Sequence, residues 1–202
     1  MYIFGGYQYG ASVRYPNYYM QCQRYDPAAN TWTPRAEMPY GNYYNCGAYV
    51  NGNIYSFAGY SFTYGWSGTC LRYNIASNTW SILTSSMSSP RYYHSCAAMN
   101  DLIYIVAGYN PNSGPVATHE VYNPATNTFS TLASTPAYQY YHGVAAVPAL
   151  NKLYSMGGYT PQGYTGINYE YSPDTNTWTT RAAISNGSSQ QNMIYISPIT
   201  LN

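Results

Sequence analysis

Short apolar and aromatic runs alternate with clusters of turn-forming residues along the chain, and no stretch shows the period of an amphipathic helix. In the best-preserved unit the runs cover residues 95–99, 102–106, 119–122 and 128–132. Runs this short, bounded by Gly, Pro, Asn and Asp, are typical of β-strands. The pattern therefore predicts an all-β chain built from units of four strands.

One turn motif recurs four times at a nearly fixed spacing. In residues 122–129 it reads Tyr-Asn-Pro-Ala-Thr-Asn-Thr-Phe, and the closing aromatics are 48, 49 and 49 residues apart. The first Asp or Asn favours a turn, and the later Asn tolerates a left-handed backbone. Four-stranded units of about 50 residues are the usual signature of propeller blades. The closing aromatics are Trp32, Trp80, Phe129 and Trp178.

Two further landmarks recur along the chain with the turn motif. The second run of each unit ends in a small residue followed by Gly and Tyr, as in Ala107-Gly108-Tyr109. Such residues permit close backbone approach at the end of a strand. The other landmark opens the first strand with two tyrosines and an Asn or His. Its three copies start at Tyr43, Tyr92 and Tyr140.

In combination these marks resemble the Kelch-repeat β-propeller family. Arg91 and His94 match the Arg and His that often open the first strand in that family. The resemblance implies one domain over residues 1–202, with four repeats of four-stranded blades. Ala58, Ala107 and Phe129 depart from the family pattern, which puts single contacts in doubt and not the fold.

The two ends of the chain read as parts of one blade. Residues 194–202, continued into residues 1–7, parallel residues 145–159. We therefore expect that the C-terminal strand completes the N-terminal blade and closes a four-bladed ring, or that the chain is a segment of a larger propeller. Kelch propellers usually have five to seven blades, so the resemblance favours the second arrangement.

Charge excludes some partners. The chain has 7 basic and 6 acidic residues and no basic stripe, so we expect no nucleic-acid partner. Its apolar runs are too short to cross a bilayer, and we see no targeting segment.

Tyrosine is unusually common, with 29 copies, and amides and hydroxyls supply most of the polarity. This composition favours an extracellular or secreted protein over a cytoplasmic one. Asn186 is a glycosylation candidate.

Four cysteines recur at matching places. Cys22 and Cys70 occupy the same position of the third strand, and Cys46 and Cys96 lie in the first strand of the repeat that follows each of them. We expect two disulfides between blades, Cys22–Cys46 and Cys70–Cys96, in an oxidising compartment. The spacing of the cysteines is not fully regular, because Cys46 aligns with Ser95 of the next repeat and not with Cys96. Four buried free thiols are the alternative.

Aromatic residues at the blade openings are the candidate binding surface. Tyrosine and tryptophan rings beside amides and hydroxyls suit a sugar ring or a protein partner. The four third-strand tyrosines (Tyr25, Tyr73, Tyr122 and Tyr171) are instead expected to pack between blades. The ligand-binding candidates are Tyr43, Tyr44, Trp66, Tyr92, Tyr93, His94, Tyr140, Tyr141 and His142.

A catalytic or metal role finds little support in the sequence. Copper-radical oxidases have a Kelch-type propeller with Tyr and His ligands, and Tyr93-His94 is similar to one such pair. That site needs another His and a Cys cross-linked to a Tyr, so we expect no cofactor and no metal. The acidic residues are scattered, and no catalytic group of residues can be identified.

We therefore expect a non-catalytic extracellular recognition or scaffold module that binds a protein or a glycan through Tyr-rich loops. The alternative is a structural subunit of an extracellular assembly, in which open sheet edges and low charge serve self-association.

Overall fold

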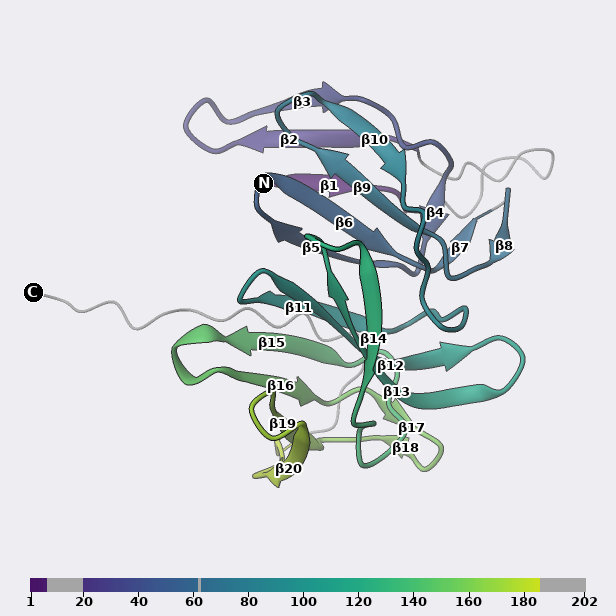
Figure 1. Cartoon of the computed structure of the whole chain (residues 1–202), viewed down its shortest axis with the longest axis vertical. Helices are drawn as coiled ribbons and strands as arrows, with labels where there is room; N and C mark the ends of the chain where they lie inside the picture. The colour runs from purple at the N-terminus through teal and green to yellow at the C-terminus, as the bar shows by residue number, and fades with distance from the viewer. Residues whose placement is uncertain (7–19, 62, 186–202) are drawn as a thin grey trace, which may run out of the picture.

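The computed structural model describes residues 1–6, 20–61 and 63–185, and shows one main antiparallel sheet for each repeat together with two small sheets of short strands. The four sheets follow one another in chain order from the top to the bottom of Figure 1. In the described part, the only helical segment is the 3-10 turn Pro148–Leu150. No helix there is long and apolar enough to cross a membrane. The all-β prediction is confirmed.

Three of the sheets have four strands, and each runs from the first to the fourth strand of its repeat without a crossover. The predicted strands at 95–99 and 128–132 are found as such, whereas those at 102–106 and 119–122 extend into a longer hairpin. The second sheet contains β5 (Cys46–Val50), β6 (Asn53–Phe57), β9 (Cys70–Asn74) and β10 (Thr79–Ile82). The third contains β11 (Ser95–Met99), β12 (Leu102–Asn110), β13 (Gly114–Asn123) and β14 (Thr128–Leu132). The fourth contains β15 (Gly143–Val147), β16 (Lys152–Met156), β19 (Asn168–Ser172) and β20 (Thr177–Arg181).

The first sheet has three strands in the described part, in the order β1 (Tyr2–Phe4), β2 (Cys22–Asp26) and β3 (Thr31–Arg35). These correspond to the second, third and fourth strands of the other sheets. A hollow lined by Phe4, Gly47 and neighbouring residues lies beside β1. The C-terminal segment that we expected to complete this blade lies outside the described residues.

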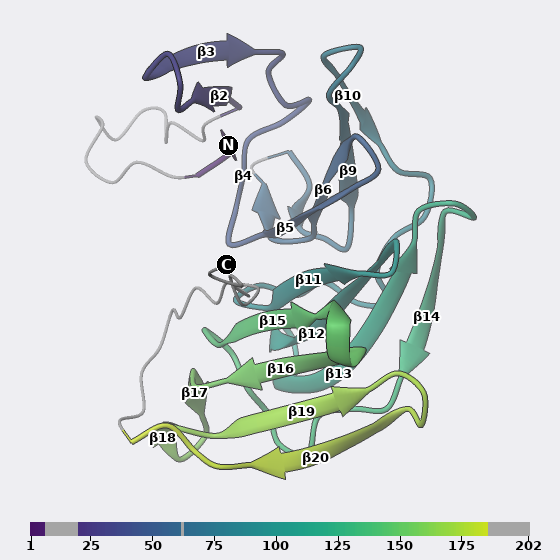
Figure 2. The same cartoon turned by 90° about the vertical axis from the view of Figure 1, so that its left-hand side faces the viewer.

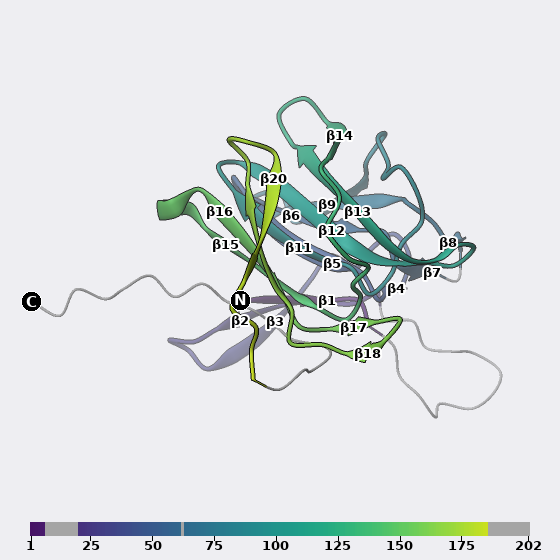
Figure 3. The same ribbon diagram turned by 90° about the horizontal axis from the view of Figure 1, so that it is seen from below.

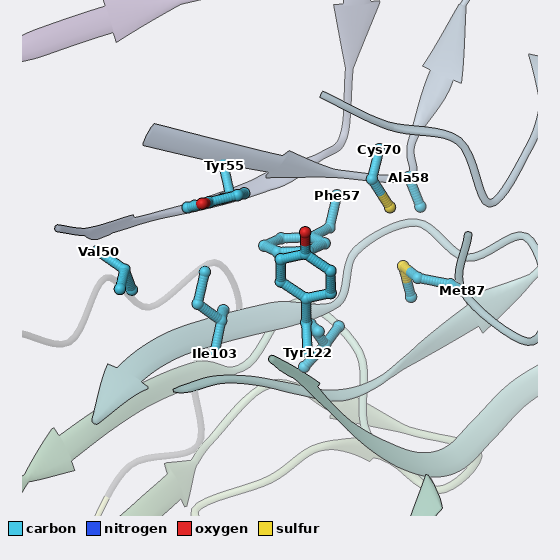
Figure 4. Packing of buried hydrophobic residues seen from close by; sticks show 9 residues of the cluster. Val50, Tyr55, Phe57, Ala58, Cys70, Met87, Ile103 and Tyr122 are labelled. Carbon is cyan, nitrogen blue, oxygen red and sulfur yellow. The ribbon is translucent and has the colours of Figure 1, made fainter. Parts of the chain in front are cut away.

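The first strands of the complete sheets, β5, β11 and β15, pack against one another. Figure 2 shows them following each other, with the remaining strands of each sheet extending outward. Buried side chains fill the space between successive sheets. Between the second and third sheets, the Phe57 and Tyr122 rings meet edge to face at 5.6 Å, beside Ile103 (Figure 4). The sheets therefore pack face to face like the blades of a propeller.

The recurring turn motif forms the corner between the third and fourth strands. In all four copies the Tyr hydroxyl donates to the Asn carboxamide five residues later, at 2.7–3.0 Å. That Asn has a φ of 52–54° in every copy, as its tolerance of the left-handed region predicts. Each Tyr ring also lies 4.8–5.0 Å from the closing aromatic ring. The motif is a locally stabilised corner.

The same corner also attaches each blade to the preceding one. Trp80 Nε1 donates to the carbonyl of Ala36 at 2.9 Å, and Trp178 Nε1 donates to that of Ala133 at 2.8 Å. Phe129 has no such donor, and there the carboxamide of Asn127 bonds the hydroxyls of Thr84 and Ser85 instead. The third-strand tyrosines Tyr73, Tyr122 and Tyr171 are at most 1% exposed, which agrees with their expected packing role.

Candidate binding surface

A buried polar side chain anchors each Tyr-Tyr opening to its own blade. The equivalent residues Asn42, Arg91 and Gln139 are at most 2% exposed. Each donates to the carbonyl of the small residue that precedes the strand-end Gly: Ala58 at 2.7 Å, Ala107 at 3.3 Å and Gly157 at 3.1 Å. From the sequence, Arg91 looked like the one complete copy of the family motif. The structure shows that Asn and Gln make the same contact.

The first tyrosine of each opening pairs with the tyrosine that follows the strand-end Gly. The pairs are Tyr43 with Tyr60, Tyr92 with Tyr109, and Tyr140 with Tyr159. Their ring centroids are 5.3, 5.2 and 5.3 Å apart. The strand-end Gly permits this approach, because a Cβ on Gly158 would lie 2.7 Å from the Tyr140 carbonyl.

The second tyrosine of each opening has a left-handed backbone. Tyr44, Tyr93 and Tyr141 have φ values of 59°, 57° and 57°. This conformation is uncommon for residues other than Gly, Asn and Asp and costs about 1–2 kcal/mol. It brings the Tyr141 amide to 3.0 Å from the Tyr93 carbonyl in the preceding blade. Backbone strain repeated at three equivalent positions is typical of functional surfaces.

The tyrosines of successive openings meet in one continuous array, which we call the aromatic layer. The ring centroids of Tyr44 and Tyr93 are 4.5 Å apart, and those of the stacked Tyr93 and Tyr141 rings are 3.7 Å apart. The Trp66 ring stacks on the Tyr92 ring with their centroids 4.1 Å apart. The layer therefore spans three blades. Its members are Tyr43, Tyr44, Tyr60, Trp66, Tyr92, Tyr93, Tyr109, Tyr140, Tyr141, Tyr159 and Tyr164.

Short strands position the aromatic layer along one end of the blades. In Figure 1 they lie on the right-hand side, opposite the hairpins that join the first and second strands of each blade. Figure 3 shows β17 and β18 at this end from below. The strands are β4 (Asn42–Tyr43), β7 (Tyr60–Ser61), β8 (Gly65–Trp66), β17 (Tyr159–Thr160) and β18 (Gly163–Tyr164).

The structure thus brings together all seven aromatic candidates identified from the sequence. It adds Tyr60, Tyr109, Tyr159 and Tyr164, which those candidates did not include. A Tyr after every strand-end Gly was a visible signal for the first three. Tyr7 is the remaining copy of that signal and lies outside the described residues. Tyr9, Tyr15, Tyr18, Tyr19 and the glycosylation candidate Asn186 also lie outside the described residues.

The hydroxyls of Tyr92, Tyr93 and Tyr140 stay neutral at physiological pH. Burial raises the pKa of Tyr93 far above its usual value, and hydrogen bonds with Tyr141 and Tyr44 raise it further. Burial also raises the pKa of Tyr92 and of Tyr140. These three residues consequently offer ring faces and neutral hydroxyl groups, and every member of the layer is a Tyr or a Trp.

The two candidate histidines require a correction, because both are buried between blades. His94 is 6% exposed, and its Nε2 lies 3.1 Å from the carbonyl of Phe57 in the preceding blade. His142 is 4% exposed. Burial lowers the pKa of His94 to about 3 and that of His142 to about 4, so both are neutral. Neither can meet a ligand at the aromatic layer.

The same geometry argues against a copper site at Tyr93 and His94. The Tyr93 ring stacks within the aromatic layer, whereas the His94 ring lies in the interior against Phe57. The two side chains therefore do not converge on a shared position. Among residues 1–6, 20–61 and 63–185, no group of three His, Cys, Asp or Glu side chains is placed to hold a metal ion.

The cysteine pairing also requires a correction. All four cysteines are free thiols, and neither expected disulfide is present. Cys22 packs with Ile54 and Tyr73 between the first and second sheets. Cys70 donates from Sγ to the carbonyl of Gly68 at 3.2 Å. Cys46 and Cys96 pack against one core cluster, whereas Cys22 belongs to another, so the neighbour of Cys46 is not Cys22.

Comparison with known proteins agrees with this architecture. The family model described as the KLHDC2/KLHL20/DRC7 Kelch-repeats domain matches residues 1–193. The solved structure of YjhT is similar, with a TM-score of 0.73 and 19% identity. That match covers 84% of this chain and 61% of the YjhT chain. At this identity the likeness concerns the fold alone. No curated protein matches the chain. The chain belongs to the Kelch-repeat family of β-propeller domains, which generally bind proteins and are usually non-catalytic.

Proposed function

We propose that this domain is an extracellular, non-catalytic recognition module that binds a protein partner through the aromatic layer. The observation that carries the proposal is the left-handed backbone of Tyr44, Tyr93 and Tyr141. A fold that needed these residues only as scaffold would be better served by Gly at such positions. Tyr at all three positions keeps a ring in the layer despite the backbone cost.

The chemistry of the aromatic layer suits a weakly charged protein surface. Tyr and Trp bury large areas and lose little side-chain entropy on binding, and for this reason they are enriched at binding hot spots. Several layer rings are accessible: Tyr44 is 44% exposed and Tyr164 is 69% exposed. Because every ring contacts another ring, the layer is ordered before a partner arrives, which lowers the entropy cost of binding. The low overall charge supports an extracellular setting.

A direct test presents the purified domain to a phage-displayed peptide library and to a glycan array. We expect peptide ligands whose affinity falls about tenfold or more in Trp66→Ala and in Tyr164→Ala, as is usual for hot spots. Tyr49→Ala is the matched control, because Tyr49 is 60% exposed at the far end of β5. Binding that none of the layer variants weakens would refute the proposal. Binding of glycans alone would replace the protein partner with a carbohydrate.

A structural role in an assembly is the second candidate, and the first blade favours it. Trp32 is equivalent to Trp80 and Trp178 but is 44% exposed, and its neighbour Tyr25 is only partly buried. The acceptors for Trp80 and Trp178 are Ala36 and Ala133. Ala182 is their equivalent after the fourth blade, and its carbonyl accepts from Asn168 as that of Ala133 accepts from His119. The fourth blade of a second copy would therefore complement the first blade.

Sedimentation velocity tests this second candidate. Head-to-tail association through Trp32 predicts oligomers whose size grows with concentration and which Trp32→Ala disperses. A wild-type chain that stays monomeric at every concentration would rule the structural role out. Trp32 is not part of the aromatic layer, so this experiment tests the structural role independently of the binding role.

A further inference from the structure

Two thiols pack against the same core cluster where the second and third blades meet. Cys46 begins β5 and Cys96 is the second residue of β11, and these two strands pack against each other. Both side chains contact the core cluster that contains Phe57 and Ile105. We propose that Cys46 and Cys96 form a reversible disulfide that joins these two blades.

The position of the pair explains the irregular spacing of the cysteines. Cys46 aligns with Ser95 in the next repeat, but the side chain that it contacts is that of Cys96, one residue further along β11. At the next interface the equivalent positions are Ser95 and Val144, which cannot form such a bond. Within the described residues, therefore, the cross-link is possible at one interface between inner strands.

The other two thiols are held elsewhere. Cys22 belongs to the cluster between the first and second sheets. Cys70 is 0% exposed and donates its S–H to the Gly68 carbonyl. Cys70 lies near enough to interact electrostatically with Cys46, which makes it the competing partner that an experiment must exclude.

The bond can form by exchange with a small-molecule disulfide such as oxidised glutathione. Burial raises the pKa of the Cys46 thiol well above its usual value, which disfavours Cys46 as the first attacking thiolate. The Cys96 thiolate displaces one glutathione as a thiol and forms a mixed disulfide. Cys46 then loses its proton and displaces the second glutathione. The protein loses two hydrogens, and the oxidant is reduced to two thiols.

The cross-link lies directly beneath two openings of the aromatic layer. Cys46 follows Tyr44 by two residues and Cys96 follows Tyr93 by three, and these two rings are in contact at 4.5 Å. The bond closes a loop of about 50 residues, which restricts the unfolded chain and favours the folded state. Oxidation is therefore expected to raise the Tm and to fix the spacing of the two openings.

Peptide mapping without reductant tests the proposal on the whole chain. After incubation with oxidised glutathione and alkylation, we expect a peptic fragment that links Cys46 to Cys96. The linked species should be two hydrogens lighter than the two fragments together. We also expect a higher Tm, and dithiothreitol should reverse both changes.

Variants taken from the chain's own repeats provide the controls. Cys96→Val copies Val144, and Cys46→Ser copies Ser95, so each places a side chain that the fold already carries at the equivalent position. Both should abolish the linked fragment and the Tm increase, whereas Cys22→Ser should retain them. Linkage of Cys46 to Cys70 or to Cys22 would overturn the proposal. So would complete alkylation of all four thiols after oxidation.

Discussion

The rings of Tyr93 and Tyr141 stack with their centroids 3.7 Å apart and 29° between their planes. The same two residues share a backbone hydrogen bond of 3.0 Å, from the Tyr141 amide to the Tyr93 carbonyl. They belong to the openings of successive blades, 48 residues apart in the chain. Two blades are thus joined at the surface by ring and backbone contacts together, and movement of one opening must displace the other.

Replacing Tyr44 by Gly should separate stability from binding. Tyr44 has a φ of 59° and is 44% exposed, so Gly relieves backbone strain and leaves little core unfilled. We expect the free energy of unfolding to change by less than about 1 kcal/mol, while binding weakens about tenfold or more. Urea unfolding and the peptide-binding assay measure the two effects.

Asn51→Gly is the matched control, because Asn51 has a φ of 46° in a hairpin at the other end of β5. Its binding should be unchanged. If Tyr44→Gly binds as well as the wild type, Tyr44 has no part in recognition.

Trp178→Phe should weaken the attachment of the fourth blade to the third. The substitution removes the hydrogen bond from Nε1 to the Ala133 carbonyl but keeps an aromatic ring, as Phe129 does in the preceding repeat. We expect a loss of about 0.5–1.5 kcal/mol in the free energy of unfolding, measured by urea denaturation. Trp32→Phe should have almost no effect, because Trp32 is 44% exposed. Equal losses in the two variants would contradict the inter-blade role of this tryptophan.

Glu120→Ala should be among the most destabilising single changes. Arg91 and Glu120 form an ion pair in which both residues are at most 1% exposed. Removing one partner leaves an uncompensated buried charge, which costs about 3–5 kcal/mol. Urea unfolding should show this loss.

A double variant tests the reason for that loss. Arg91→Gln copies Gln139, and Glu120→Leu copies Leu71, the residues at the equivalent positions of other repeats. Because the double variant replaces both buried charges with neutral side chains, no charge is left unpaired, and it should recover most of the lost stability. If the double variant is as unstable as Glu120→Ala, the stability at this position depends on how the side chains pack and not on the unpaired charge.

Stability should fall in mildly acidic solution because three histidines are buried in the neutral form. Burial lowers the pKa of His94 and of His119 to about 3, and that of His142 to about 4. The unfolded chain, with an ordinary His pKa near 6.5, binds more protons. The stabilising contribution is therefore complete above about pH 6.5 and is lost as the pH falls from there toward 4, by up to about 1.4 kcal/mol per pH unit for each His.

The pH dependence of the urea midpoint measures this effect. His119→Asn, which copies Asn168 of the fourth blade, should remove about one third of the slope, because each of the three histidines contributes at most one proton. A midpoint that does not change between pH 7 and pH 5 would mean that these histidines are accessible to protons in the folded state.

The parts of this structure that could be predicted from the sequence are those that recur. The corner motif contains both its hydrogen-bond donor, Tyr122, and its acceptor, Asn127. The same turn could therefore be predicted at all four copies. The sequence does not show in which direction neighbouring side chains point at the start of a strand. His94 and Tyr93 are adjacent in the sequence, but the His94 ring lies against the Phe57 carbonyl and the Tyr93 ring stacks on Tyr141. Contacts between blades depend on how two strands are offset, which explains why Cys46 was paired with Cys22 and not with Cys96.

The hydrogen bond that holds each Tyr-Tyr opening has its donor and acceptor in the same blade, as in Gln139 to Gly157. The tryptophan contact does not, because Trp178 needs a carbonyl from the blade before it. The side-chain anchor of an opening therefore moves with its own blade. The backbone bonds of the opening do not, because the Gln139 carbonyl accepts from the Gly108 amide and the Tyr141 amide donates to the Tyr93 carbonyl, both in the preceding blade. A designer who exchanges one blade's opening must therefore match its backbone, as well as the corner, to the new neighbour.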